Sequence, residues 1–421
     1  MVLLLYRFLV ALAEGLLFPL SLFHRRAAAL LRIRKEGIQA LRQIQIPEGA
    51  EVWWVHCASL GEFEQARPVM QELKKQRKQV FIALSFFSPS GYVPARNTKD
   101  ADFVFALPAD RPVCNRLVMQ ALKPAAAIWV KYDFWFGYLN ALNRAKVPLY
   151  VIAAVFPKQH FLFQFPGKLL LPVLKQSRCI FTQDAPSLSV LQEQGFTQVQ
   201  HAGDTRFDRV LQLRMHAAPV PMADVFRQES LMVIAGSSWP AEEALLHTFI
   251  DHYGMVGWKL ILVPHDVSEA HIKDLQVRFH SFGARLWSEF TEPDPGVHIL
   301  IVDSIGLLSR LYRHAHIAVV GGGYRGALHN ILEAAVYGMP VIFGPDTEKF
   351  WEAQAAVSEG WGFQALNQNH FDEVLHQLLG SEARRKNAAQ ASSAAVRHHS
   401  GATDIIMQTL CMLPEGAHDL H

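Results

Sequence analysis

Apolar and polar residues alternate in blocks along most of this chain. From residue 51 onward, short runs rich in β-branched and aromatic residues are separated by segments in which apolar residues recur at helical spacing. In the first half the short runs occupy residues 51–57, 79–86, 101–108, 125–130, 148–155 and 179–184. They show little alternation between polar and apolar positions, which is typical of strands buried on both faces of a parallel sheet. The pattern therefore predicts a sheet covered by helices such as 64–76 and 136–146.

The block pattern breaks once and then restarts. Residues 214–230 contain two prolines and no clear periodicity. Apolar runs return at residues 231–237, 258–264, 297–304, 316–322 and 340–345. This order predicts two successive doubly wound α/β domains, and a length of 421 residues suits two domains better than one. In such sheets ligands bind beyond the carboxyl ends of the strands, so we expect the site at the strand-to-helix turns.

The first 23 residues differ from the rest of the chain. They carry only two charged side chains, Arg7 and Glu14, and are long enough to cross a bilayer, although these charges and Pro19 weaken a spanning helix. A basic cluster follows directly: His24, Arg25, Arg26, Arg32, Arg34 and Lys35. Because the basic residues follow the apolar run, the segment fits a membrane anchor on the cytoplasmic side better than a cleaved signal peptide. A buried helix of the first domain is the alternative.

Composition narrows the classes of function. Half of the residues are hydrophobic and 19% are charged, as in a folded globular protein. A net charge of +2 does not indicate a nucleic-acid-binding face. The four cysteines form no CxxC pair, which argues against a zinc site or a disulfide framework and favours a reducing compartment.

Glu62 lies where the first apolar run ends and the next helical segment begins. Ser59 and Glu62 match a capping box, in which the carboxylate accepts a hydrogen bond from the N–H of Ser59. The same carboxylate lies beyond the carboxyl end of a strand, where it could take a proton from a substrate, and Gly61 leaves room for that substrate. The first helical turn favours the ionised carboxylate and lowers its basicity. The residues alone leave both roles open.

A glycine-rich turn follows the apolar run at 316–322. Gly321, Gly323 and Gly326 match G-x-G-x-x-G, a pattern that suits a dinucleotide and leaves an oxidoreductase open. The next strand ends in Gly344-Pro345 instead of the acidic residue that would bind a ribose in such enzymes.

We expect a helix after these glycines. His329 and Glu333 are four residues apart and Asn330 and Glu333 three apart, so the three would share one helical face. A solvated polar face is the alternative. A carboxylate that binds vicinal hydroxyls, beside a glycine turn that admits phosphate, describes a nucleotide-sugar donor site.

Three further turns of the second half can meet the same ligand. Ser237 and Ser238 follow one strand, where backbone N–H groups can contact phosphate or a serine can cap the next helix. Pro264 and His265 follow a second strand, and residues 304–307 follow a third.

Together these segments resemble the 3-deoxy-D-manno-octulosonic acid (Kdo) transferases, membrane-associated glycosyltransferases of lipopolysaccharide inner-core assembly. The resemblance covers nearly the whole chain: the apolar N-terminus, HCASLGE, AGDTRFD, AGSSWPAEE, VDSIGLLSRLY and GGGYRGALHNILEAAVYGMPVIFGPDTEKF. It implies an α/β fold of the GT-B type, in which two Rossmann-like domains face a central cleft. We therefore divide the chain into an N-terminal membrane anchor with a basic juxtamembrane segment, an acceptor domain, a linker and a nucleotide-sugar domain, at residues 1–35, 36–213, 214–230 and 231–421.

The resemblance also implies roles by position. Glu62 would be the general base. The donor, CMP-Kdo, would contact Pro264, His265, Ile305, Gly306, Leu307, Asn330, Ile331, Leu332 and Glu333. Contacts to donor phosphate or carboxylate would come from Arg206, Ser237, Ser238, Arg325 and His329. The chain departs from the family at His265, which replaces an arginine, and at residues 131–137, where the family has an acidic pair before Trp-Pro.

The implied reaction transfers Kdo from CMP-Kdo to a lipid A precursor at the cytoplasmic face of the inner membrane, with inversion and without a metal or cofactor. An oxidoreductase that uses residues 321–326 and a non-catalytic membrane-bound scaffold are the two alternatives from other classes. No nucleic-acid partner is expected.

Overall fold

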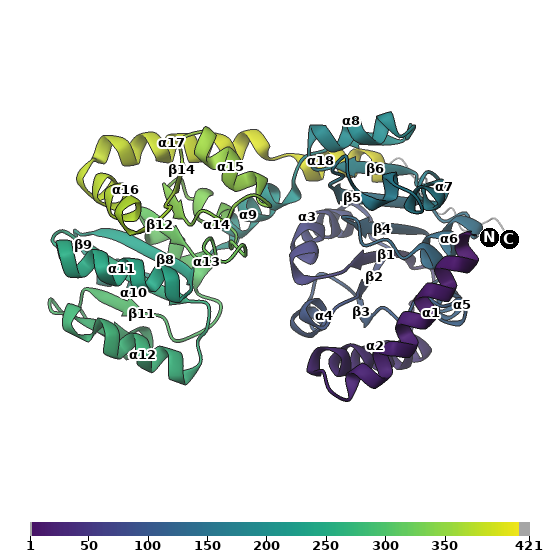
Figure 1. Cartoon of the computed structure of the whole chain (residues 1–421), viewed down its shortest axis with the longest axis horizontal. Helices are drawn as coiled ribbons and strands as arrows, with labels where there is room; N and C mark the ends of the chain where they lie inside the picture. Colours follow the sequence, from purple (N-terminus) through teal and green to yellow (C-terminus); the bar gives the residue numbers. More distant parts are fainter. Residues whose placement is uncertain (1, 412–421) are drawn as a thin grey trace. The chain divides into compact units, whose positions relative to one another are not determined.

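The chain forms two compact α/β units, each built on one seven-stranded parallel sheet. The computed structural model describes residues 2–411. One unit contains residues 1–209 and the segment that begins at Ser400, and the other contains Val210–His399. In each unit helices lie on both faces of the sheet (Figure 1). The two doubly wound domains expected from the apolar runs are therefore present.

The sheet of the first unit has the order β3-β2-β1-β4-β5-β6-β7. Its strands are β1 (Glu51–Cys57), β2 (Val80–Phe86), β3 (Phe103–Ala106), β4 (Ala126–Val130), β5 (Leu149–Ala154), β6 (Cys179–Thr182) and β7 (Val199–His201). Its helices are α1 (Val2–Ser21), α2 (Arg25–Gln43), α3 (Leu60–Gln76), α4 (Pro89–Ala95), α5 (Pro112–Leu122), α6 (Phe136–Arg144), α7 (Leu171–Leu174), α8 (Ala185–Glu193), the first turns of α9 (Thr205–His216), and α18 (Ala402–Leu410). The strand order reverses between β1 and β4, where a doubly wound sheet opens a crevice at its carboxyl edge.

The sheet of the second unit has the order β10-β11-β9-β8-β12-β13-β14. Its strands are β8 (Leu231–Ser238), β9 (Trp258–Pro264), β10 (Ala284–Leu286), β11 (Ile299–Ile301), β12 (Ile317–Val320), β13 (Val341–Phe343) and β14 (Gly362–Gln364). Its helices are α10 (Pro221–Arg227), α11 (Pro240–Tyr253), α12 (Glu269–Phe279), α13 (Leu308–Leu311), α14 (Leu332–Ala335), α15 (Trp351–Ser358), α16 (Gln368–Gly380) and α17 (Glu382–His399). The corresponding reversal lies between β8 and β12.

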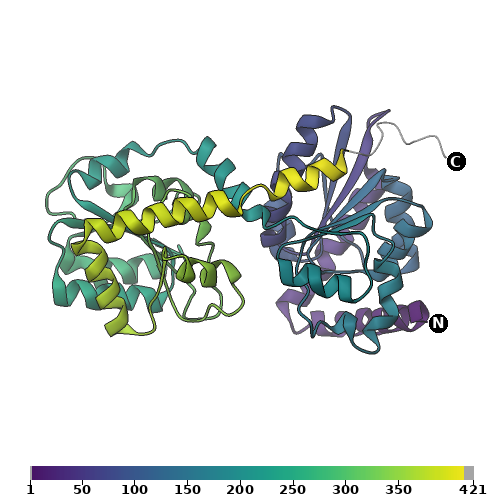
Figure 2. The same ribbon diagram turned by 90° about the horizontal axis from the view of Figure 1, so that it is seen from above.

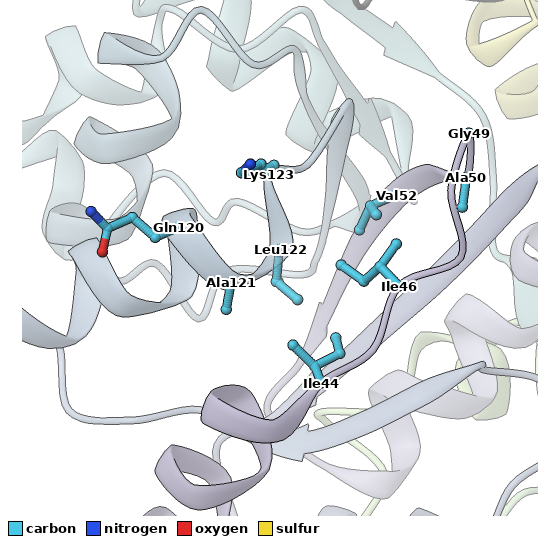
Figure 3. Close-up of a pocket in the computed structure, with 9 residues that line it drawn as sticks. All are labelled: Ile44, Ile46, Gly49, Ala50, Val52, Gln120, Ala121, Leu122 and Lys123. Atoms are coloured by element: carbon cyan, nitrogen blue, oxygen red, sulfur yellow. The ribbon is translucent and has the colours of Figure 1, made fainter.

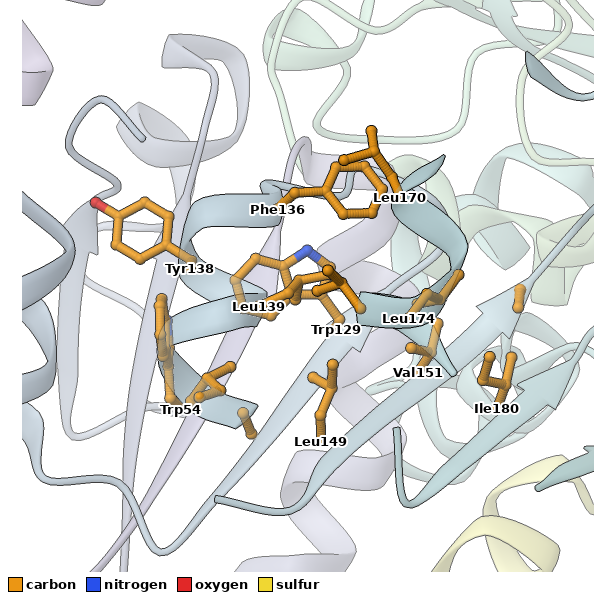
Figure 4. Close-up of a cluster of buried hydrophobic side chains, with 14 of the residues drawn as sticks. Trp54, Trp129, Phe136, Tyr138, Leu139, Leu149, Val151, Leu170, Leu174 and Ile180 are labelled. Carbon is orange, nitrogen blue, oxygen red and sulfur yellow. The ribbon is translucent and has the colours of Figure 1, made fainter. Parts of the chain in front are cut away.

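Aromatic residues fill one face of the first sheet. Trp54 on β1 and Trp129 on β4 contact edge to face at 5.2 Å between ring centroids, and Tyr138 of α6 packs on Trp54 at 5.5 Å. Figure 4 shows these rings among leucines from α6 and the 170–174 segment. Trp53, the neighbour of Trp54 on the opposite face of the strand, is equally buried. Burial on both faces explains why the strand reads as one continuous apolar run.

Two features differ from the domain limits expected from the sequence. The expected linker, 214–230, contains the helix α10. Phe226 on this helix is buried, and its carbonyl oxygen accepts a hydrogen bond from the Lys259 ammonium at 2.8 Å. The last helix, α18, packs against α3 of the first unit (Figure 2), although the sequence assigned residues 231–421 to one domain. Asp208 on α9 binds the start of α18 through the N–H groups of Gly401 and Thr403, at 2.6 and 2.7 Å.

The N-terminal helix α1 contacts the first unit along one side only. Tyr6 donates a hydrogen bond to Asp110 at 2.7 Å, and Glu14 forms an ion pair with the buried Arg34. The other side of α1 exposes a row of large apolar side chains that includes Phe8, at 64% exposure. Among the described residues, Leu3–Ser21 is the one stretch of helix long and apolar enough to cross a membrane.

Candidate active site

Glu62 occupies the first turn of α3, directly beyond the carboxyl end of β1. Its carboxylate accepts a hydrogen bond from the N–H of Ala58, one residue before the N-cap Ser59. The Ser59 side chain makes no capping bond. The capping box expected from the sequence is therefore not formed, because the carboxylate reaches one residue further back than that motif requires.

The electrostatic setting of Glu62 also differs from the expectation. The residue is only 9% exposed, and burial raises the pKa of its carboxyl above the ordinary value for glutamate. The Ala58 N–H and the electrostatic effects of His56 and Lys131 act against this rise, and the Asp133 carboxylate adds to it. The expected loss of basicity in the first helical turn is wrong, because desolvation of the buried charge outweighs the favourable end of the helix.

A second polar group lies at the same edge of the sheet. His56, near the end of β1, is fully buried, with Nδ1 2.8 Å from the hydroxyl of Ser85 and Nε2 3.4 Å from a carboxylate oxygen of Asp133. The indole of Trp135 donates to the same carboxylate oxygen at 3.0 Å. The sequence carries one signal for this group, a histidine inside an otherwise apolar strand, and the predicted site does not include it.

In the second unit, four ring or guanidinium groups from three strand-to-helix turns lie together. Trp239, after β8, stacks on His265, after β9, with 4.3 Å between ring centroids. Its Nε1–H donates to Nε2 of His329, after β12, at 3.2 Å. The guanidinium carbon of Arg325 lies 4.2 Å from the Trp239 ring. Burial, together with the charge of His265, lowers the pKa of His329 to about 4, so His329 is neutral at neutral pH.

A buried carboxylate fixes two of these turns relative to each other. Glu242, in the first turn of α11, accepts hydrogen bonds from the N–H of Trp239 at 3.0 Å and from the N–H of Gly322 at 2.9 Å. Burial raises the pKa of Glu242. The role of Glu242 and the stacking of Trp239 were both missed in the sequence, because each depends on a contact between separate turns: Glu242 and Gly322 are 80 residues apart, and Trp239 and His265 belong to turns after different strands.

The glycine-rich segment does not lead directly into a helix. Residues 321–326 form turns, 327–330 have no regular structure, and α14 covers only Leu332–Ala335. The first of these turns needs glycine, because the backbone of Gly321 packs directly on that of Ser237. A Cβ on Gly321 would lie 2.1 Å from the carbonyl oxygen of Ser237. The shared helical face expected for His329 and Glu333 is therefore wrong, since His329 precedes the helix.

Asn330 and Glu333 nevertheless come together. The side-chain amide of Asn330 lies 3.4 Å from a carboxylate oxygen of Glu333, and its carbonyl oxygen accepts a hydrogen bond from the N–H of Leu332 at 3.1 Å. Tyr312, buried beneath this segment, has a raised pKa because of its burial and the charge of Glu333. The pair thus presents one amide and one carboxylate at the start of α14, with Ile331 and Leu332 buried below.

The remaining predicted site residues lie in different environments. Ser238 is buried, and its hydroxyl donates to Glu243 at 3.1 Å, while Ser237 has a φ of +48° at a bulge of β8. Neither serine is the N-cap of α11, which is Trp239. Arg206 belongs to the first unit, where Asp204 accepts its Nε–H at 2.9 Å.

The last predicted contacts flank the strand ends of the second sheet. Pro264 is the final residue of β9, and the N–H of His265 donates to the carbonyl of Ser238 at 2.9 Å. The turn before α13 exposes Ile305 and places Gly306 at a φ of +96° before Leu307. Because β11, β9, β8 and β12 are neighbours in that order, these turns lie along one edge of the sheet.

One cavity of the first unit lies away from Glu62. It has a volume of about 560 Å³ and is lined by residues at the amino end of β1 and the end of α5: Ile44, Ile46, Gly49, Ala50, Val52, Gln120, Ala121, Leu122 and Lys123 (Figure 3). Glu62 follows the opposite end of the same strand, so this cavity is not part of the candidate site.

Comparison with known proteins finds similar enzymes along most of the chain. The model of a family described as 3-deoxy-D-manno-octulosonic-acid transferase (kdotransferase) matches residues 32–209. The enzyme of that name from Aquifex aeolicus is 29% identical over 334 residues, which are 77% of this chain and 85% of the relative. The enzyme from Bordetella pertussis is 26% identical over 376 residues, 83% of this chain and 84% of the relative. These matches support a Kdo transferase. Such an enzyme is a glycosyltransferase of lipopolysaccharide biosynthesis, an activity that the oxidoreductase alternative does not fit.

Solved structures place this Kdo transferase in the GT-B fold. The UDP-GlcNAc 2-epimerase from Neisseria meningitidis bound to UDP-GlcNAc aligns with a TM-score of 0.61 at 16% identity, over 86% of this chain and all of that one. MurG from Acinetobacter baumannii aligns with a TM-score of 0.54 at 11% identity, over the same shares. At these identities the likeness establishes the fold alone.

The raised pKa of Glu62 predicts a change in stability. The folded protein binds the Glu62 proton more tightly than the unfolded chain does. The protonated Glu62 therefore stabilises the fold below the pKa that Glu62 has in the unfolded chain, and this stabilisation is lost as pH rises through the pKa that it has in the folded protein. Glu62→Gln cannot ionise, so it does not lose stability as pH rises, and its side-chain oxygen can still accept the hydrogen bond from the Ala58 N–H. We expect the variant to be at least as stable as the wild type at pH 7, with its relative advantage shrinking toward pH 4, in denaturant unfolding followed by circular dichroism.

Glu72→Gln is the matched control on the same helix. Hydrogen bonds from Gln76 and Lys75 lower the pKa of Glu72, so its contribution to stability has the opposite dependence on pH. A Glu62→Gln variant that is less stable at pH 7 than at pH 4, relative to the wild type, would show that the Glu62 carboxylate stabilises the fold as a cap.

Proposed function

We propose that this Kdo transferase uses CMP-Kdo as donor and a lipid A precursor as acceptor, with Glu62 as the general base. The observation that supports this most strongly is the buried carboxyl with a raised pKa at the carboxyl end of β1. A carboxylate of raised pKa takes a proton more readily than an ordinary one. A Cβ on Gly61 would meet no atom within 4 Å, so there is open space at the residue before Glu62, which suits the approach of an acceptor.

The proposed reaction balances with Glu62 alone as proton acceptor. The Glu62 carboxylate removes the proton of the primary hydroxyl of the acceptor as the hydroxyl oxygen attacks the anomeric carbon of Kdo. The bond between that carbon and the CMP phosphate oxygen breaks on the opposite side, CMP leaves as an anion, and the anomeric configuration inverts. Asp133, near Glu62, adds a negative charge that keeps the base strong.

The donor is proposed to bind at the strand ends of the second unit. The Asn330 amide and the Glu333 carboxylate suit the vicinal hydroxyls of a ribose. The side chains of Ile331 and Leu332 are buried, so these two residues would contact the nucleoside through backbone atoms. Pro264 with His265, and the turn of Ile305, Gly306 and Leu307, end neighbouring strands of the same sheet edge.

The direct test of this function is product analysis. The full-length protein, incubated with CMP-Kdo and a tetra-acylated lipid A precursor, should yield the precursor with one or more added Kdo units by mass spectrometry, and CMP should inhibit the reaction competitively. Absence of any Kdo-bearing product, with the acceptor recovered intact, would contradict the proposed donor and acceptor.

The proposed cellular place is the cytoplasmic face of the inner membrane. The exposed face of α1 carries apolar side chains while Tyr6 and Glu14 attach the helix to the folded unit. The basic residues that begin α2, Arg25 and Arg26, are exposed beside it and suit anionic headgroups.

Substitutions on the exposed face of α1 test this association without removing the contacts of Tyr6 and Glu14. Phe8 and Leu16 are 64% and 62% exposed, so Phe8→Glu with Leu16→Glu adds two charges without opening the core. We expect most of this variant in the soluble fraction after a high-salt wash of membranes, since salt screens the remaining attraction of the basic cluster. Val277→Glu, at an apolar residue of α12 that is 72% exposed, is the control and should leave the distribution unchanged. Full retention of the double variant in salt-washed membranes would exclude this face as the anchor.

A further inference from the structure

Arg325 is an exposed arginine whose guanidinium rests on an indole. It lies in the glycine-rich turn after β12, with its guanidinium carbon 4.2 Å from the Trp239 ring. Within residues 2–411 its side chain makes no hydrogen bond and no ion pair with another residue. A guanidinium that stacks on an aromatic ring keeps the N–H donors along its edge for a planar anion, and it stays charged at all physiological pH values.

The indole beneath Arg325 is held in place from several directions. Nε1–H of Trp239 donates to the neutral His329, its ring stacks on His265, and its backbone N–H donates to the buried Glu242. Both oxygens of Glu242 accept backbone N–H bonds, one of them from Gly322 in the same turn as Arg325. Arg325 is therefore presented by a rigid support, which reduces the entropy lost when a ligand binds.

Other anion contacts expected from the sequence are already engaged. Arg206 is in the first unit and is bonded to Asp204. The Ser238 hydroxyl donates to Glu243, and the N–H of Gly322 donates to Glu242.

A cavity borders the same turn. It has a volume of about 260 Å³ and is lined by Gly326, the residue after Arg325, and by Pro345, Asp346, Glu348, Lys349 and Phe350. The Asp346 and Glu348 carboxylates can accept hydrogen bonds from sugar hydroxyls. An anionic group at Arg325 would thus have room for an attached polyhydroxylated group on one side.

We infer that Arg325, supported by Trp239, is the anion subsite of the donor site and determines the affinity for an anionic nucleotide sugar. This inference rests on the proposed donor, CMP-Kdo. The anion is either the nucleotide phosphate or the carboxylate of the sugar, and both suit the fork of a guanidinium.

Titration of the full-length protein with CMP and with CMP-Kdo tests the subsite. Arg325→Gln should weaken CMP-Kdo binding about 10- to 100-fold, the scale of one charge-assisted hydrogen-bonded contact. Arg325→Lys should recover part of this loss, because it restores the charge without the planar fork. Lys273→Gln removes one exposed positive charge from α12 and should leave the affinity within about twofold, since salt screens an exposed charge that does not contact the ligand.

The two ligands separate the two sources of the anion. If Arg325→Gln loses affinity for CMP and CMP-Kdo equally, the anion that contacts Arg325 is the phosphate. If the loss is confined to CMP-Kdo, the anion is the sugar carboxylate. Wild-type affinity of Arg325→Gln for both ligands would overturn the inference and leave the proposed donor intact. A wild-type protein that binds neither ligand would instead overturn the proposed donor, and this inference with it.

Two further measurements separate a binding role from a structural one. The Kd of the wild type for CMP-Kdo should rise more steeply with salt than that of Arg325→Gln, because the variant has lost one ion pair with the ligand. Trp239→Leu removes the support but keeps the arginine, so it should weaken CMP-Kdo binding less than Arg325→Gln does. Melting temperatures of all variants show whether the fold is retained. A salt dependence identical in the wild type and Arg325→Gln would contradict a direct contact.

Discussion

Each sheet buries both of its faces, and this constraint decides where chemistry can occur. Strands such as β1 and β8 have nearly every side chain in the core, so a polar group on them can reach a substrate only where the strand ends. In parallel sheets all carboxyl ends lie at one edge, and there the chain changes from strand to helix. Glu62 in the first unit and the Trp239, His265 and Arg325 group in the second unit both occupy such edges.

Burial also sets the reactivity of Glu62. A fully exposed carboxylate would be a weak base, and a carboxylate buried without a donor would remain protonated at neutral pH. The Ala58 N–H and the nearby His56 and Lys131 limit the rise in pKa that desolvation causes. Burying this charge lowers the stability of the fold. The backbone is also strained at the same edges, where Ala153 and Ser237 adopt positive φ values at bulges of β5 and β8.

The sequence was sufficient for the long buried strands but not for contacts between distant segments. Continuous apolar runs identified β1 and β8, whereas β7, β10 and β14 have only three residues each and are too short to show a period. The helix expected around His329 was wrong because Gly321 and Gly323 pack against other backbone segments, which local spacing cannot reveal. The support of Arg325 by Trp239 depends on residues 86 positions apart and so needed the fold.

The pH dependence of turnover tests the central claim, that Glu62 is the base, most directly. With CMP-Kdo and a lipid A precursor, wild-type kcat/KM should fall as pH drops through the raised pKa of Glu62, since the protonated carboxyl cannot accept a proton. Glu62→Gln should lower kcat/KM by roughly 10²–10⁴-fold and remove this acidic limb, without weakening CMP binding. Near-normal turnover of Glu62→Gln, with the acidic limb retained, would contradict the account.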